Sequence, residues 1–390
     1  MRVFVTIPRL IRAAVCLLVL GSASTAVSAA VLIPAPPSLA ASAYVLMDAN
    51  TGKVIISQNA DQRLPPASLT KLMTSYIADY EIAQGNISKQ DRVLVSEKAW
   101  RTPGSRMFIR EGTQVLVGDL LKGIIIQSGN DASVAMAEHI AGSEDAFADL
   151  MNQHARQLGM NNSQFQNATG LPKEGHFTTA NDLALLARSI IRDFPDDYPI
   201  YAEKYFTYNK IRQPNRNKLL WRDSRVDGLK TGHTEEAGYC LVASAKDKGM
   251  RLISVVLGTN SEEARAQESQ KLLSYGFRYY ESADLYQAGE VLNEAKVWAG
   301  TRDSLKLGTA ESISITIPRG QSDALGVTLD LDKVIQAPVT EGASYGTLNI
   351  TLGDELLQQV PVVALESVEP AGLVKRIWHS IVLFFLSLIG

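Results

Sequence analysis

Cysteine is nearly absent from this chain of 390 residues. One of its two cysteines, Cys16, lies in a segment that we expect to be removed, so Cys240 remains alone. A single thiol cannot form an intrachain disulfide, and the core must therefore be stable without covalent cross-links. Because Cys240 lies within the apolar residues 237–243, we interpret it as a small residue of a buried strand.

Histidine is also scarce, with five residues in the chain. No two histidines have the H-x-x-x-H spacing of a metal site, and no Cys/His cluster exists. We therefore expect neither a metal nor another cofactor. The net charge of −3 gives no reason to expect nucleic acid as a partner. Hydrophobic content of 46% and charged content of 20% are ordinary for a globular protein, and the length allows two domains.

Long hydrophobic runs are missing as well. The apolar residues 13–20 are too few to span a bilayer. They follow a basic region made of Arg2, Arg9 and Arg12, and small residues stand at 27–29. This pattern predicts a signal peptide over residues 1–29 and export of a mature chain that begins near Ala30. The alternative is a retained N-terminal anchor.

The most informative stretch is residues 64–74, which contains Ser68 and Lys71. Two prolines, Pro65 and Pro66, favour an extended entry. A helical period follows, carried by Leu69, Leu72, Met73, Ile77 and Tyr80. It predicts a helix that ends near Gln84, with Ser68 at its start and Lys71 one turn further on the same face.

This S-x-x-K pair suits nucleophilic catalysis. A serine hydroxyl needs a neighbouring base, and a lysine can serve if burial or a second cation lowers its pKa. The helix N-terminus adds N–H groups that favour an anionic intermediate. The alternative is a serine N-cap followed by a surface lysine.

Strand-like segments at both ends of residues 30–280 enclose a mostly helical region. The expected strands are 43–48, 53–58, 229–232, 239–244 and 252–257. The expected helices are 117–126, 131–140, 143–158, 179–192 and 262–280. This order indicates an α+β fold in which one sheet is built from both chain ends, with a helical lobe inserted.

The remaining chain changes character twice. Residues 281–368 contain segments in which apolar and polar residues alternate, such as 312–317. This pattern predicts a small β-sandwich domain.

In residues 369–390, the basic side chains of Lys375, Arg376 and His379 fall near one helical face. The opposite face carries Leu373, Ile377, Trp378, Ile381 and Phe385. We expect an amphipathic helix at a membrane surface; the alternative is a helix packed on the protein itself.

Two more short motifs follow Ser68 and Lys71 in order. The first is Ser128-Gly129-Asn130, between two expected helices; Ser57-Gln58-Asn59 has the same pattern, but we interpret it as structural. The second is Lys230-Thr231-Gly232, on an expected strand, where the alternative is an edge-strand lysine before a turn. Each motif is weak alone, but S-x-x-K, S-x-N and K-T-G in this order form a strong joint signal.

With these motifs the chain resembles the low-molecular-mass penicillin-binding proteins, specifically the D-alanyl-D-alanine carboxypeptidases. The resemblance covers nearly the whole chain and implies a β-lactamase/transpeptidase-like catalytic domain over residues 30–280. It implies removal of the terminal D-alanine from peptidoglycan stem peptides, and covalent acylation by penicillins and other β-lactams. It places the protein at the periplasmic face of the cytoplasmic membrane, attached through the C-terminal helix.

The resemblance also implies roles for individual residues. Ser68 attacks the carbonyl between the two D-alanines, and Lys71 accepts its proton. Burial and the charge of Lys230 are expected to lower the pKa of Lys71. Ser128 relays the proton to the leaving amine, and Asn130 holds the substrate amide or orients Lys71.

Substrate binding is expected on the K-T-G strand and beside it. The backbone N–H groups of Ser68 and His233 would form the oxyanion hole, and Gly232 would let the substrate backbone approach. The terminal carboxylate would be held by Lys230, Thr231 and Arg265. For Arg265 the alternative is a solvated helix charge paired with Glu262. Arg216 matches a family position near the site, and its alternative is an ordinary loop arginine.

Three other functions stay open at this point. An efficient β-lactamase is disfavoured because residues 167–176 lack the E-x-x-L-N pattern, and we expect Glu174 to be a surface residue. We therefore expect a penicillin adduct that turns over slowly. An endopeptidase that cuts cross-links, or a wall-binding scaffold without activity, would share the fold.

Overall fold

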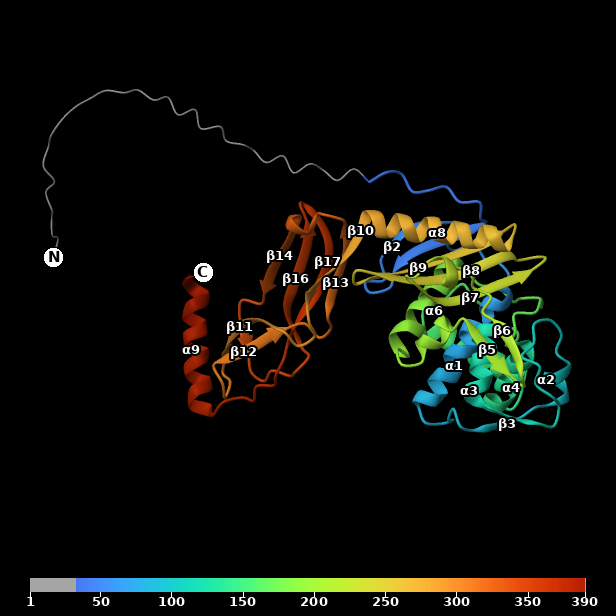
Figure 1. Ribbon diagram of the computed structural model, residues 1–390. Coiled ribbons are helices and arrows are strands. Elements are labelled where there is room, and N and C mark those ends of the chain that lie inside the picture. Colours follow the sequence, from blue (N-terminus) through green and yellow to red (C-terminus); the bar gives the residue numbers. More distant parts are fainter. Residues whose placement is uncertain (1–32, 390) are drawn as a thin grey trace, which may run out of the picture. The chain divides into compact units, whose positions relative to one another are not determined.

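The computed structural model describes residues 33–389 (Figure 1). The expected signal peptide and the expected mature start at Ala30 lie outside the described residues. Two β-rich parts follow one another along the described chain, the first with helices packed on both faces of its sheet.

The sheet of the first part has five antiparallel strands in the order β2-β1-β9-β8-β7. Its strands are β1 (Ala43–Asp48), β2 (Val54–Gln58), β7 (Val226–Thr234), β8 (Gly238–Asp247) and β9 (Met250–Thr259). In Figure 1 the blue β1 lies beside the yellow β9. The prediction that both chain ends build one sheet is confirmed.

Alternating residues of β1 divide the core into two layers. Val45 and Met47 belong to the cluster that the sheet shares with the inserted helices. Tyr44 and Leu46 face the other way and pack with residues of α8 (Glu262–Tyr279). All six residues of β1 are buried, because helices cover both faces of the sheet. Cys240, in β8, is 1% exposed, which confirms it as a core residue.

The inserted lobe is mostly helical. Its longer helices are α1 (Lys71–Ala83), α4 (Asn130–Ala141), α5 (Glu144–Gln157) and α6 (Ala180–Asp193). The shorter elements β3 (Arg92–Leu94), α2 (Glu97–Arg101), β4 (Gln114–Leu116) and α3 (Val117–Lys122) lie between α1 and α4, and β5 (Tyr205–Tyr208), β6 (Ile211–Pro214) and α7 (Leu219–Arg222) follow α6. The hydroxyl groups of Ser143 and Thr179 cap α5 and α6 by accepting the backbone N–H groups of Ala146 and Asp182.

The second part is all β, as expected. The strands β10 (Tyr280–Tyr286) and β13 (Ile313–Pro318) form one pair. The other sheet has the order β14-β16-β17-β12-β11-β15. Its members are β11 (Val291–Trp298), β12 (Ser304–Gly308), β14 (Leu325–Leu331), β15 (Ile335–Gln336), β16 (Ser344–Leu352) and β17 (Glu355–Ala364). Residues of both sheets, Ile315 and Ile350 among them, share one core.

The chain ends in α9 (Leu373–Ile389), which contacts the β domain through its polar side chains. Lys375 pairs with Asp303, and the Ala299 N–H donates to His379 Nδ1. Trp378 is 63% exposed and Phe384 61% exposed, so the apolar face of α9 is uncovered. Within residues 33–389, none of the helices has the length and apolarity to cross a bilayer.

Candidate active site

Ser68 lies in η1 (Ala67–Thr70), a short 3-10 turn, and α1 begins at Lys71. The expected α-helix therefore starts later than the sequence pattern suggests. Pro65 and Pro66 enter the turn, and Ala67 adopts the left-handed region with φ of 47°. This unusual backbone places Ser68 just before the start of α1. Strained backbone of this kind is typical of functional sites.

Lys71 is 1% exposed, and its amino group contacts the Ser68 hydroxyl. Nζ lies 3.2 Å from Ser68 Oγ, 2.7 Å from Asn130 Oδ1 and 2.5 Å from the Thr169 carbonyl oxygen. These three acceptors match the three N–H bonds of an ammonium group. The S-x-x-K pair is thus a buried contact, and the alternative of a surface lysine is wrong.

Burial, followed by the charge of Arg216, lowers the pKa of Lys71 to about 7, while Asp131 opposes the shift. Arg216 is therefore the cation that lowers the pKa of Lys71; the expected coupling with Lys230 is seen in the lowered pKa of Lys230, to which Lys71 contributes. At neutral pH a large share of Lys71 is consequently neutral and can accept a proton.

Ser128 and Asn130 reach the site from a distorted helix end. The expected helix 117–126 ends at Lys122, and η2 (Gly123–Gln127) widens into a π turn. Ser128 follows with φ of 64°, and its buried Oγ has no hydrogen-bond partner among the described residues. Asn130 Nδ2 donates to the Pro103 carbonyl at 2.6 Å, which holds the amide oxygen towards Lys71. A buried, unpaired hydroxyl in a cavity is available to a substrate.

The K-T-G residues lie on β7, the edge strand beside Ser68. Lys230 is buried, and burial, Lys71 and Arg216 together lower its pKa well below the usual value. A Cβ at Gly232 would lie 3.2 Å from the Pro66 carbonyl oxygen and 3.2 Å from Leu69 Cγ. The glycine at this position lets β7 approach η1 closely. This packing role adds to the expected role of Gly232, which was to let the substrate backbone approach.

Two arginines line a cavity of about 190 Å³ next to the serine. Arg265, in the first turn of α8, is 5% exposed and donates to the Gly232 carbonyl at 3.0 Å. It is therefore not a solvated helix charge, although Glu262 lies 3.9 Å away. Arg216 is exposed, donates to the Gln127 carbonyl and lines the same cavity, so it is not an ordinary loop arginine either.

The cavity brings together most of the predicted site residues. Its lining includes Ser68, Ser128, Arg216, Thr231, Gly232, His233 and Arg265. Lys71 adjoins it through its contact with the Ser68 hydroxyl, and Asn130 through its contact with Lys71. The Ser68 hydroxyl, in contact with a lysine of lowered pKa, and two guanidinium groups therefore border the same cavity. This arrangement can transfer an acyl group from a substrate that carries a carboxylate.

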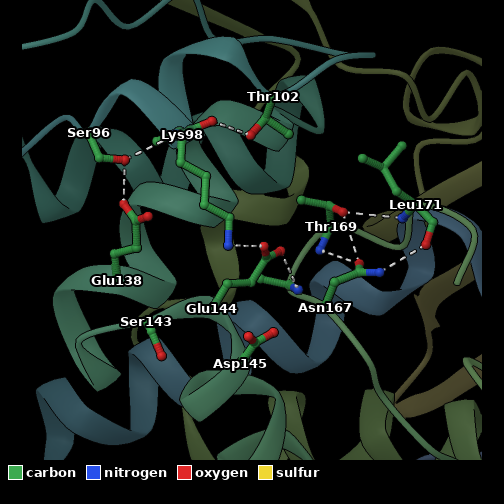
Figure 2. Close-up of polar contacts among 12 residues, drawn as sticks. Ser96, Lys98, Thr102, Glu138, Ser143, Glu144, Asp145, Asn167, Thr169 and Leu171 are labelled. Carbon is green, nitrogen blue, oxygen red and sulfur yellow. Dashed lines mark hydrogen bonds and ion pairs between the residues drawn. The ribbon is translucent and has the colours of Figure 1, made fainter.

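The loop 166–176 carries the contact that sequence reasoning missed, the Thr169 carbonyl on Lys71. Asn167 folds this loop: in Figure 2 its Oδ1 accepts from the Thr169 N–H group and its Nδ2 donates to the Leu171 carbonyl. The Gly170 N–H group also donates to Asn167 Oδ1. Glu144 accepts the Ala168 N–H and pairs with Lys98. Glu174, in the same loop, is exposed as expected.

His176 connects this loop with η1, the turn that carries Ser68. Its Nε2 lies 2.9 Å from Thr70 Oγ1, and its Nδ1 accepts the Gln166 N–H at 3.3 Å. The ring is therefore neutral with its proton on Nε2. Burial, followed by the charges of Lys173 and Lys71, lowers the pKa of His176 to about 4.

Comparisons with known proteins agree with this geometry. Residues 30–261 match the protein family described as D-alanyl-D-alanine carboxypeptidase. Residues 280–370 match the family described as the C-terminal domain of penicillin-binding protein 5.

The chain is 45% identical to D-alanyl-D-alanine carboxypeptidase DacC of Escherichia coli over 90% of its own length and 89% of that relative. It is 43% identical to DacA of the same organism over 91% and 90% of the two lengths. A crystal structure of penicillin binding protein 5 from Haemophilus influenzae superposes with a TM-score of 0.83 at 43% identity. That match covers 86% of this chain and 99% of the other.

Proposed function

This chain belongs to the family of D-alanyl-D-alanine carboxypeptidases, and we propose that Ser68 is the nucleophile of that reaction here. The enzyme is a serine-type hydrolase that removes the terminal D-alanine from peptidoglycan stem peptides, and it binds penicillins. The roles of individual side chains rest on the geometry around Lys71.

Acylation begins when neutral Lys71 takes the proton of Ser68 Oγ, 3.2 Å away. The oxygen attacks the carbonyl carbon between the two D-alanines, and a tetrahedral oxyanion forms. The backbone N–H groups of Ser68 and His233 stabilise it; losing one such donor costs about 10²–10³ in rate. The C–N bond then breaks, a proton reaches the amine through Ser128, and D-alanine leaves. Water releases the shortened peptide.

The free carboxylate of the substrate is held at the far end of the 190 Å³ cavity. Arg265 is fixed there by the Gly232 carbonyl, and Arg216 by the Gln127 carbonyl. Thr231 adds a hydroxyl from β7, and Lys230 lies buried next to it on the same strand. Two guanidinium groups on one small cavity favour a C-terminal residue over an internal one, which distinguishes a carboxypeptidase from an endopeptidase.

The observation that carries this assignment is the buried Lys71 amino group in contact with Ser68. The decisive experiment is intact-mass spectrometry of residues 30–368 with a fluorescent penicillin and with diacetyl-Lys-D-Ala-D-Ala. We expect a penicillin adduct on Ser68 and release of D-alanine, and neither in Ser68→Ala. An adduct without D-alanine release would favour the endopeptidase or scaffold; a folded protein without any adduct would refute the serine assignment.

β-Lactams should react at the same serine and leave slowly. The loop 166–176 offers the Thr169 carbonyl to Lys71, and its carboxylate Glu174 is exposed. Fast, steady hydrolysis of nitrocefin would contradict this and favour a β-lactamase.

The cellular setting is part of the proposal. Residues 1–29 act as a signal peptide, and the mature enzyme works at the periplasmic face of the cytoplasmic membrane. The support is the exposed apolar face of α9, which suits the interface between headgroups and acyl chains.

A further inference from the structure

Two further cavities lie near the turn that carries Ser68, and neither is lined by Arg216 or Arg265. The first, of about 640 Å³, begins at Ala67 and Thr234 and extends along the loop to Phe177. The second, of about 700 Å³, continues beyond Phe177. Both are lined by Arg63 and Phe177, so these two residues mark the place where the cavities meet.

Arg63 is held in position at this junction without a neutralising partner. Its guanidinium lies 4.7 Å from the centre of the Phe177 ring, and Nη2 donates to Asn162 Oδ1 at 3.2 Å. Within residues 33–389, no carboxylate oxygen lies within the 4.0 Å ion-pair limit of this group. An oriented cation without a counter-charge favours an anionic ligand.

The direction of the donor peptide follows from the site. Its terminal carboxylate faces Arg265 and Arg216, so the residues before the scissile bond leave on the opposite side of Ser68. That side is bounded by Ala67 on the nucleophile turn and Thr234 at the end of β7, the first residues of the 640 Å³ cavity. An extended peptide along edge strand β7 therefore enters this cavity.

The charges along the first cavity restrict where an anion can bind. Glu174 and Glu236 line it and repel a carboxylate there. Lys173 also lines it, but its amino group donates to the Gln166 carbonyl and lies 3.9 Å from Asp145. Among the described residues that line this cavity, Arg63 remains as the cation that is oriented and has no ion pair.

We propose that Arg63 binds a carboxylate of the donor stem peptide upstream of the D-Ala-D-Ala end. This inference rests on the proposed function and extends it to substrate selection. Stem peptides carry such groups as the α-carboxylate of a γ-linked glutamate and as the second carboxylate of a diamino acid. Either source offers the same chemistry to a guanidinium.

The test compares stem pentapeptides whose two carboxylates are both free, amidated at the glutamate, or amidated at the diamino acid. The readout is kcat/KM for D-alanine release by the enzyme, by Arg63→Gln and by Arg212→Gln. Arg212 is a matched control, because it is exposed and stacks 3.7 Å from the Tyr205 ring but lines neither cavity.

We expect amidation of one carboxylate to lower kcat/KM about two- to fivefold for the enzyme, as suits an exposed ion pair. Arg63→Gln should abolish this preference, and Arg212→Gln should keep it. The amide that matters identifies which carboxylate is bound. An unchanged preference in Arg63→Gln would overturn the proposal, as would an enzyme indifferent to both amides.

These outcomes are separate from failure of the proposed function. If no peptide released D-alanine while penicillin still acylated Ser68, the carboxypeptidase assignment would fall, and the proposal with it. If all peptides were cleaved with equal kcat/KM, only the role of Arg63 would be refuted.

Discussion

Lys71 is deeply buried, which favours the neutral amine, but its contacts suit an ammonium group. These opposing effects determine how readily Lys71 binds and releases a proton. Three acceptors surround Nζ, yet burial and Arg216 favour the neutral amine. A group balanced in this way can accept a proton from Ser68 and later return it, which is what acylation and deacylation need.

The first prediction concerns the pH dependence of acylation. Lys71 is protonated below its pKa of about 7 and neutral above it, so the rate constant for penicillin acylation should rise as pH increases through about 7. Well below that pH it should fall about tenfold per unit. Stopped-flow measurements with a fluorescent penicillin between pH 5 and 9 give the profile.

Arg216→Gln provides the control for this profile. Removing that cation should raise the pKa of Lys71 and move the rise to higher pH. A flat profile, or one that shifts to lower pH in the variant, would contradict the role of Lys71 as the base.

The second prediction concerns His176 and acid stability. Its pKa is near 4 in the folded protein, against about 6.5 when unfolded, so the unfolded chain binds more protons as pH falls between these values. The enzyme should therefore lose about 1–2 kcal/mol of unfolding free energy between pH 7 and 5 through this residue. Urea unfolding at both pH values should show a smaller loss in His176→Gln. Equal losses in both proteins would refute it.

Sequence motifs are defined by side chains, so sequence reasoning could point to Ser68, Lys71, Asn130 and the K-T-G residues. It missed the Thr169 carbonyl, because every residue has one and only the fold selects which one meets Lys71. It named Lys230 as the cation near Lys71 and did not include Arg216, which also lowers the pKa of Lys71. That choice depends on distance and burial in three dimensions, which spacing along the chain does not encode.

Among the elements, the loop 166–176 and the turn η1 fit together with little free space. Gly170 has φ of +81°, and a Cβ there would lie 1.8 Å from the Ala67 carbonyl oxygen. The residue before Ser68 and the loop that contacts Lys71 therefore hold each other in place.

The third prediction is that Gly170→Ala damages catalysis through this contact. Displacing Ala67 should move Ser68 and lower kcat/KM by about 10²-fold or more. Gly159→Ala is the matched control, because Gly159 has φ of +79° but no atom within 4 Å of the position that a Cβ would take. It should cost about 1 kcal/mol of stability and leave kcat/KM unchanged. Similar kinetics in the two variants would show that the close approach is unimportant for catalysis.

Long helices and strands with clear capping residues could be predicted from the sequence, and short ones could not. Helix α6 matches its prediction because Thr179 caps a strongly periodic segment. The strands β3 and β5 have three and four residues, too few for an alternating pattern to appear. The π turn η2 was missed because its apolar residues continue the helical composition of α3.

At the scale of the whole molecule, the order of strand and helix patterns predicted the shared sheet and the separate β domain. The tail was predicted as an amphipathic helix, and α9 has polar contacts to the β domain with its apolar side chains exposed. Sequence alone could not say which residues of the β domain would meet it, since Asp303 and Ala299 lie in turns without a recognisable pattern.

The fourth prediction is that α9 attaches the enzyme to membranes and takes no part in catalysis. A chain ending at residue 368 should keep its kcat/KM on a soluble peptide and lose binding to vesicles containing anionic lipids in a flotation assay. The variant Ile377→Glu with Phe385→Glu keeps the helix but makes its exposed face polar, and it should also fail to bind. Binding by either altered protein would contradict the role of α9.

The pairing of β1 with β9 also governs when the protein can fold. Ala43 lies opposite Leu257, so the first strand has no neighbour on that side until the ribosome has added the whole helical lobe and β9. Contacts so distant in sequence slow folding, and until β9 is made β1 has only β2 as its pairing partner. Until then the β1–β2 hairpin keeps one open edge along β1, which the last strands of the catalytic domain must find.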